Sequence, residues 1–196
     1  MKLFILLIAS VLFISGGWAD ELSPEGKASA HPPYKRTYFE HWIDEDNDCQ
    51  DTRVEKLADT NLSEDKLVSA NFCHLDVGLW YDPYGGAMWP RSTDLDLDHI
   101  VPLKYAWEHG AWQWENARRR AFANDPENLI LVRNRLNRQK GAKGPEQWLP
   151  PRESYRCEYI FRFLTVLAKY SLDWGDAWQA VAQCEKKTSS NELVKE

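Results

Sequence analysis

The sequence lacks several features that would place it in common classes of protein. After residue 14 it has no apolar run approaching the ~20 residues that cross a bilayer, so no later transmembrane helix is expected. It has no internal repeat, and its length suits one domain with a sizeable core. Its four cysteines form no Cys-x-x-Cys pair, which argues against a zinc ribbon. The formal net charge of −6, taken alone, argues against a nucleic-acid-binding protein.

The charge is unevenly distributed along the chain. Residues 20–98 carry 18 Asp and Glu against 7 Lys and Arg, whereas residues 99–156 carry 11 Lys and Arg against 6 acids. Because the local field attracts a polyanion, the second stretch could bind nucleic acid despite the net charge. A solvated, charged helix face is the alternative.

The ends of the chain have the composition of segments outside the fold. Residues 1–19 resemble a cleaved signal peptide, with a basic Lys2, an apolar run over residues 3–14 and small residues before a cleavage site after Ala19; a membrane anchor is the alternative. Residues 20–35 are expected to be a flexible leader, 36–187 the folded domain and 188–196 a disordered tail.

Export allows disulfides, and three pairings of Cys49, Cys73, Cys157 and Cys184 are possible. Proximity favours Cys49 with Cys73 and Cys157 with Cys184.

Hydrophobic periodicity and turn signals predict an α+β domain, mostly helical, with a small antiparallel β element at its centre. The acidic run at residues 44–48 lacks the glycine and distal Glu of an EF-hand, so a solvated loop is expected there. Helices are expected over residues 52–57, 63–70, 103–107, 111–122 and 133–140 and over two C-terminal stretches, one around residues 160–167 and one around 174–181. Strands are expected over residues 72–81, 88–91, 95–100 and 129–132, and a turn at residues 82–86 is expected to join the first two as a hairpin.

The stretch from Asp94 to Gly141 contains the residues best suited to catalysis. Asp98 can bind a hard divalent cation, and Asn137 can add an amide oxygen. His99 can act as a general base because imidazole titrates near neutral pH. Neighbouring residues of a strand face opposite sides, so Asp98 and His99 must lie at a strand end to serve one site. Asp96 shares the face of Asp98 and is a further possible metal residue, or a turn cap.

The motif Asp-Leu-Asp-His-Ile-Val-Pro at residues 96–102, followed by Asn128, Asn137 and Lys140-Gly141, resembles the HNH nuclease signature, which forms a ββα-metal finger. The stretch from Cys49 to Cys184 resembles, more broadly, a secreted bacterial HNH endonuclease family related to the C-terminal nuclease domain of GmrSD restriction enzymes. Gly78-Leu79-Trp80, residues 123–126 and residues 148–151 carry that wider similarity.

The resemblance implies specific roles for the motif residues. His99 would be the general base, Asp98 and Asn137 metal ligands, and Asn128 a structural brace of the finger. Colicin-type members have His at the position of Asn137, so an oxygen ligand set favours Mg²⁺ or Mn²⁺ over Zn²⁺ here. The implied protein is a secreted, metal-dependent endonuclease acting on DNA, with RNA left open, as a monomer with little sequence specificity and no membrane association after signal cleavage.

Two other functions stay open at this stage. The chain could be a secreted Trp-rich module that binds a glycan or protein and carries a non-catalytic finger; Trp107, Trp112, Trp114 and Trp148 would then be exposed in one patch. It could also bind DNA without cleaving it. For the nuclease, phosphate contacts are expected from Arg119, Arg135 and Lys140, and the insertion at residues 103–127 is expected to determine substrate preference.

Overall fold

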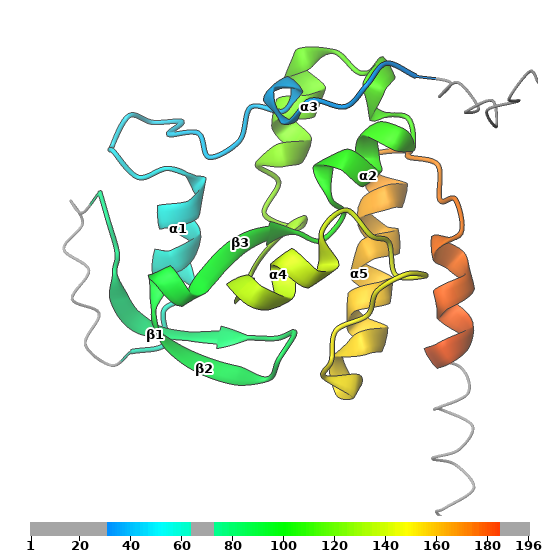
Figure 1. The fold of residues 1–196 in the computed structure, drawn as a ribbon. Coiled ribbons are helices and arrows are strands. Elements are labelled where there is room, and N and C mark those ends of the chain that lie inside the picture. Colours follow the sequence, from blue (N-terminus) through cyan, green and yellow to red (C-terminus); the bar gives the residue numbers. More distant parts are fainter. Residues whose placement is uncertain (1–30, 64–72, 185–196) are drawn as a thin grey trace, which may run out of the picture. The chain divides into compact units, whose positions relative to one another are not determined.

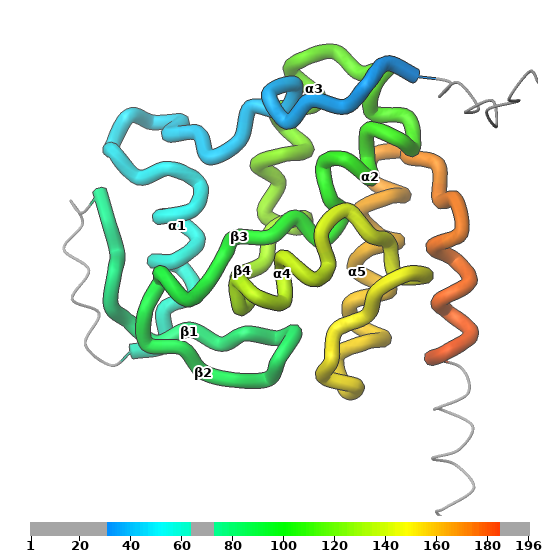
Figure 2. Tube along the Cα trace, viewed as in Figure 1, coloured from blue at the N-terminus to red at the C-terminus, as the bar shows by residue number. Residues whose placement is uncertain are grey.

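A computed structural model describes residues 31–63 and 73–184, which lie within one unit of the chain. These residues form helices and two small antiparallel sheets, which agrees with the predicted α+β class (Figures 1 and 2). No helix in these ranges is long and apolar enough to cross a membrane. The α-helices are α1 (Thr52–Asp59), α2 (Leu103–Glu108), α3 (Asn116–Ala123), α4 (Asn134–Lys140) and α5 (Arg156–Lys169). The strands are β1 (Val77–Asp82), β2 (Ala87–Arg91), β3 (Leu95–His99) and β4 (Leu129–Arg133), and short 3-10 helices are η1 (Arg36–Tyr38), η2 (Ser92–Asp94), η3 (Ala111–Gln113), η4 (Glu153–Tyr155) and η5 (Ala177–Val181).

Strands β1 and β2 form the predicted hairpin. They pair antiparallel, with Trp80 opposite Trp89, and the turn between them begins at Asp82. The Asp82 carboxylate accepts hydrogen bonds from the backbone N–H groups of Tyr84 and Gly85 at 2.9 and 3.1 Å. Side-chain acceptors of this kind replace ladder hydrogen bonds in tight turns, so the aspartate fixes the turn.

Strands β3 and β4 form the second sheet, and its register decides which way the motif residues face. Asp96 pairs with Val132 and Asp98 with Ile130, while His99 pairs with Leu129. Directly paired residues share one face of an antiparallel sheet. The two aspartates therefore face the larger core, which contains Ile130 and Val132. His99 lies on the other face, whose core residues are Leu57, Trp80, Leu95, Leu97, Leu129 and Leu131.

Helix α4 follows β4 directly and contacts both β3 and β4 (Figure 1). It ends where predicted, at Gly141, which has a φ of 57° and donates its N–H to the carbonyl of Asn137 at 2.9 Å. A left-handed residue after the last turn is most easily supplied by glycine. This sequence of β3, β4 and α4 brings residues 96–99 next to residues 137–140.

Two helix predictions are wrong in detail. The helix expected over residues 111–122 is divided into η3 and α3, because Trp114 is extended (ψ 151°) and turns its indole against Phe122 and Tyr170. The last expected helix is the 3-10 helix η5, preceded by Gly175 in a left-handed conformation with φ of 50°. The helix expected over residues 63–70 lies outside the described residues, apart from its first position.

Both expected disulfides are present, Cys49–Cys73 and Cys157–Cys184. They span 24 and 27 residues. Each closed loop of this size limits the unfolded chain and contributes about 3 kcal/mol to stability. The first disulfide begins at Cys49, directly after the acidic loop, and closes a segment that contains α1; the second joins α5 to the end of the described chain.

Candidate active site

His99 ends strand β3 and has only 5% of its surface exposed. Its Nε2 atom lies 2.8 Å from the backbone carbonyl oxygen of Ala123, at the end of α3. A carbonyl oxygen only accepts hydrogen bonds, so Nε2 carries the hydrogen and Nδ1 carries the lone pair of the neutral ring. Burial lowers the pKa of His99 from 6.5 to about 3. The ring is therefore neutral near pH 7, with a basic nitrogen directed away from α3.

An aromatic side chain covers the ring of His99. The indole of Trp42 stacks on the imidazole with 5.4 Å between ring centroids and an interplanar angle of 15°, and the ring of His41 lies 6.4 Å from that of His99. Trp42 has a φ of 58°, which is rare for a bulky residue and costs on the order of 1–2 kcal/mol. The packing of the indole against the imidazole offsets that cost and restricts the ring of His99.

Asp98 lies on the opposite face of β3 and is held by two buried partners. The ammonium of Lys140 lies 2.9 Å from its carboxylate, and the hydroxyl of Tyr84 donates to it at 2.9 Å. Lys140 is 0% exposed and also donates to the carbonyl of His99 at 2.7 Å. Burial raises the pKa of Asp98 and lowers the pKa of Lys140, against their mutual attraction. Asp98 and Lys140 thus neutralise each other on the face of β3 opposite to His99.

Asp96 and Asn137 form a second, more accessible pair on the same face as Asp98. The Nδ2 atom of Asn137 donates to Oδ2 of Asp96 at 3.1 Å, and both side chains are half-buried. Within the described residues, no donor contacts the Oδ1 atoms of Asp96 or Asn137. Carboxylate and amide oxygens are the ligands that Mg²⁺ and Mn²⁺ prefer, so Asp96, Asp98 and Asn137 are of the right residue types for a hard divalent cation. Both carboxylate oxygens of Asp98 are already bound by Lys140 and Tyr84, whereas Oδ1 of Asp96 and of Asn137 is open in the part of the chain that the structure describes.

Asn128 joins β4 to the segment that follows His99. It is 0% exposed, and its Oδ1 accepts from the N–H of Val101 at 2.8 Å while its backbone carbonyl accepts from Ile100 at 2.8 Å. Buried amides with both partners satisfied fix the local backbone firmly. Asn128 thereby holds the chain immediately after His99.

The three cations expected to contact phosphate have different surroundings. Arg119 donates to the carbonyls of Tyr38 (3.1 Å) and Trp114 and to the side chain of Asn116. Lys140 is buried against Asp98, so its ammonium does not face solvent. Arg135 is exposed on α4 and has no hydrogen bond or ion pair with the described residues.

Several Arg and Trp side chains of the insertion at residues 103–127 contact other parts of the protein. Arg118 donates to the carbonyl of Tyr170 at 2.7 Å, and Arg120 pairs with Glu45 at 2.9 Å. Trp107 is 4% exposed, and Trp112, Trp114 and Trp148 are partly buried against the larger core. These four indoles do not form the exposed patch that a Trp-rich binding module would require.

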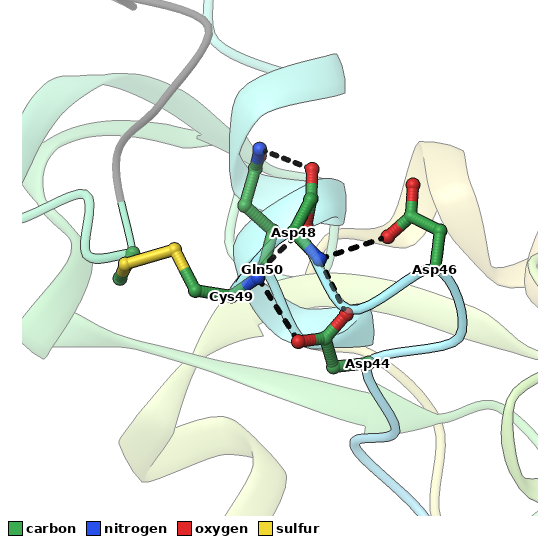
Figure 3. The surroundings of a disulfide bond; sticks show 6 residues. Asp44, Asp46, Asp48, Cys49 and Gln50 are labelled. Carbon is green, nitrogen blue, oxygen red and sulfur yellow. Dashed lines mark hydrogen bonds between the residues drawn. A yellow bond between two sulfur atoms is a disulfide. The ribbon is translucent and has the colours of Figure 1, made fainter.

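In the acidic loop before α1, aspartate side chains accept hydrogen bonds from backbone N–H groups of the same loop (Figure 3). Oxygens of Asp44, Asp46 and Asp48 lie within 4.8 Å of one another, and all three side chains are exposed. The Asp44 carboxylate accepts from the N–H groups of Asp48 and Cys49 at 3.2 and 3.0 Å. These hydrogen bonds shape the loop beside the Cys49–Cys73 disulfide.

The candidate site thus combines an imidazole of fixed tautomer with one buried carboxylate, one half-buried carboxylate and a carboxamide. Residues 37–180 match the family described as GmrSD restriction endonucleases, C-terminal domain. The chain belongs to this family of nuclease-type domains, as the sequence resemblance indicated. It is also 39% identical over 142 residues to an uncharacterized secreted protein of Arthroderma benhamiae, covering 71% of this chain and 67% of that protein. No solved structure matches the chain significantly.

The structure adds site residues that the sequence did not identify. Trp42 and His41 precede His99 by more than fifty positions, and Tyr84, expected only in a turn, donates to Asp98. The carbonyl of Ala123 carries no sequence signal because any residue could supply it. The one local sequence feature that could have pointed to these residues is that His41 and Trp42 are neighbours in a short aromatic segment.

Proposed function

We propose that this chain is a metal-dependent endonuclease that hydrolyses phosphodiester bonds of DNA with little sequence specificity. The observation that carries the proposal is the hydrogen bond from Nε2 of His99 to the Ala123 carbonyl, which leaves Nδ1 as a base in a neutral ring. Family membership supports the same chemistry. The finger formed by β3, β4 and α4 offers few groups that could read base edges, and phosphate contacts carry no sequence information.

In the proposed reaction, Nδ1 of His99 takes a proton from the water that attacks phosphorus. The hydrogen bond from Nε2 to Ala123 stabilises the imidazolium that forms, and Trp42 keeps the ring in place. The pKa of about 3 in the free protein is low for a general base. A bound phosphodiester raises it, because a negative charge next to the ring favours the protonated form.

The proposed metal residues are Asp98 and Asn137, with Asp96 as a third oxygen donor. A bound Mg²⁺ or Mn²⁺ would supply positive charge for the oxygen that leaves phosphorus. Lys140 competes for the Asp98 carboxylate, because its ammonium already lies 2.9 Å away. Asn137 and Asp96 hold each other in place through their 3.1 Å hydrogen bond.

We propose further that the protein is exported. The N-terminal sequence has the pattern of a signal peptide, the described chain contains two disulfides, and the Arthroderma benhamiae relative is described as a secreted protein. Disulfides form and persist mainly in oxidising compartments, which agrees with export.

The test compares the wild-type mature chain with His99→Ala and with His74→Ala, a control histidine that is exposed and distant in sequence. We expect His99→Ala to reduce cleavage of plasmid DNA by about 100-fold or more, and the control to cleave normally. EDTA should stop cleavage, and added Mg²⁺ or Mn²⁺ should restore it. Undiminished cutting by His99→Ala would overturn the assignment, and cutting in EDTA would overturn the metal requirement. Parallel reactions on single-stranded DNA and RNA decide the substrate.

A further inference from the structure

Residues 36–42, here called the N-terminal arm, lie against α3 (Figure 2). Arg119 donates to the carbonyl of Tyr38 at 3.1 Å, and Asn124 donates to the carbonyl of Glu40 at 2.8 Å. Asn124 follows Ala123, whose carbonyl holds the imidazole of His99. Two consecutive residues at the end of α3, Ala123 and Asn124, therefore hold His99 and the N-terminal arm in position relative to each other.

One cation of the arm, Arg36, is hydrogen-bonded to His41, whose ring lies near that of His99. Nδ1 of His41 lies 2.9 Å from the carbonyl oxygen of Phe39, so Nδ1 carries the hydrogen and Nε2 is an acceptor. Nε of Arg36 donates to that Nε2 at 3.2 Å. The ring of His41 is itself 6.4 Å from the ring of His99. His41, held by its hydrogen bond to Phe39, therefore lies between the guanidinium of Arg36 and the ring of His99.

The outer end of Arg36 is available to a ligand. Arg36 is exposed, and its two Nη atoms have no hydrogen bond with the described residues. A guanidinium presents paired N–H donors that match the oxygens of a phosphodiester. By contrast, the guanidinium of Arg119 and the ammonium of Lys140 are already bound within the protein.

We propose that Arg36 binds the phosphodiester group that is attacked at His99, and that His41 is a positioning residue that orients Arg36. The inference rests on the proposed nuclease function and adds a substrate contact to it. The arm would thus contribute a substrate-binding residue from outside the motif at residues 96–140. Arg36 neutralises phosphate charge and takes no part in proton transfer.

The first test measures binding without cleavage. Fluorescent DNA is titrated with wild type, Arg36→Ala and Lys35→Ala in EDTA over a series of salt concentrations. Lys35 is the matched control because it is an exposed cation directly before Arg36. We expect Arg36→Ala to weaken binding about 10-fold or more and to reduce the slope of log K against log salt by nearly 1. Lys35→Ala should change the affinity less than about 2-fold.

The second test measures cleavage with Mg²⁺. Arg36→Ala should lower kcat/KM about 10- to 100-fold without lowering Tm, and Arg36→Gln, which keeps a donor for His41 but no charge, should show most of that loss. His41→Ala should lower kcat/KM less, and the double variant should be no worse than Arg36→Ala, because His41 acts through Arg36.

The outcomes separate the two proposals. If wild type cleaves in a His99-dependent manner but Arg36→Ala binds and cleaves normally, the inference about Arg36 is wrong and the nuclease assignment stands. Equal losses in Arg36→Ala and Lys35→Ala also contradict it, because they indicate only a general effect of charge. If wild type does not cleave any nucleic acid, the proposed function itself fails.

Discussion

The buried neutral ring of His99 should make the stability of the protein depend on pH in a definite direction. Burial lowers the folded pKa from 6.5 to about 3. As pH falls below about 6.5, the unfolded chain takes up a proton on this histidine and the folded protein does not. The free energy of unfolding should therefore be unaffected by His99 above that pH and fall progressively as the pH drops toward 3.

The size of the effect follows from the pKa difference. Each pH unit between the two pKa values corresponds to about 1.4 kcal/mol. Lowering the pH from 7 to 4 should therefore remove about 3 kcal/mol of stability through His99, as an order of magnitude. The ring is only 5% exposed, so solvent screening does little to reduce this figure. A loss of that size is a large part of the stability of a typical domain.

The assay is urea unfolding at pH 7 and pH 4, in EDTA and with the disulfides intact, for wild type and His99→Gln. The variant lacks the titrating group, so its loss of stability between the two pH values should be smaller than that of wild type by about 3 kcal/mol. Asp98 has a raised pKa and acts in the opposite sense, but it is present in both proteins. His74→Gln, at an exposed site, should behave like wild type. Equal losses in wild type and His99→Gln would refute the reasoning.

Three further changes test how the site is supported, each by urea unfolding at pH 7. Asn128→Ala should cost about 2 kcal/mol because it leaves the buried N–H of Val101 without its 2.8 Å acceptor. Lys140→Met should cost about 4 kcal/mol because it leaves the carboxylate of Asp98 buried without its cation, and adding Asp98→Asn should recover much of that loss. Gly141→Ala should cost about 1 kcal/mol because its φ is 57°, although the added methyl meets no close contact; no change would contradict the left-handed cap.

The sequence predicted those elements whose signals are local. The hairpin turn at Asp82 and the helix end at Gly141 depend on neighbouring residues, and the structure has them where expected. The strand expected over residues 95–100 is present as β3, which ends one residue earlier, at His99. The break at Trp114 was not predictable in this way, since it depends on rings of α3 and α5 that its indole contacts. The arrangement of η5 was missed because helical spacing alone does not separate 3-10 from α-helix.

The site was predictable only in part, for the same reason. The motif contains the candidate residues His99, Asp96, Asp98 and Asn137, but several partners of those side chains come from distant positions. Tyr84 reaches Asp98 across 14 residues, and Lys140 reaches it across 42. The stacking of Trp42 on His99 likewise depends on the path of the N-terminal arm. Residue types at the centre of a site are visible in the sequence, whereas the residues that hold them depend on the fold.

The two faces of β3 explain how one strand can serve two chemical requirements. In the proposed reaction the base is His99, whose apolar surroundings keep its ring neutral: the face with Leu97 and Leu129 and the indole of Trp42. The oxygen donors need polar neighbours, and Asp96 and Asp98 obtain them from α4 on the other face. Alternation along the strand separates the two environments, and we propose that the end of the strand at His99 allows both to act on one substrate group. A one-residue shift of β3 would exchange the environments and leave a charged carboxylate in the apolar face, so the register of the β3–β4 pair is itself a condition for the proposed reaction.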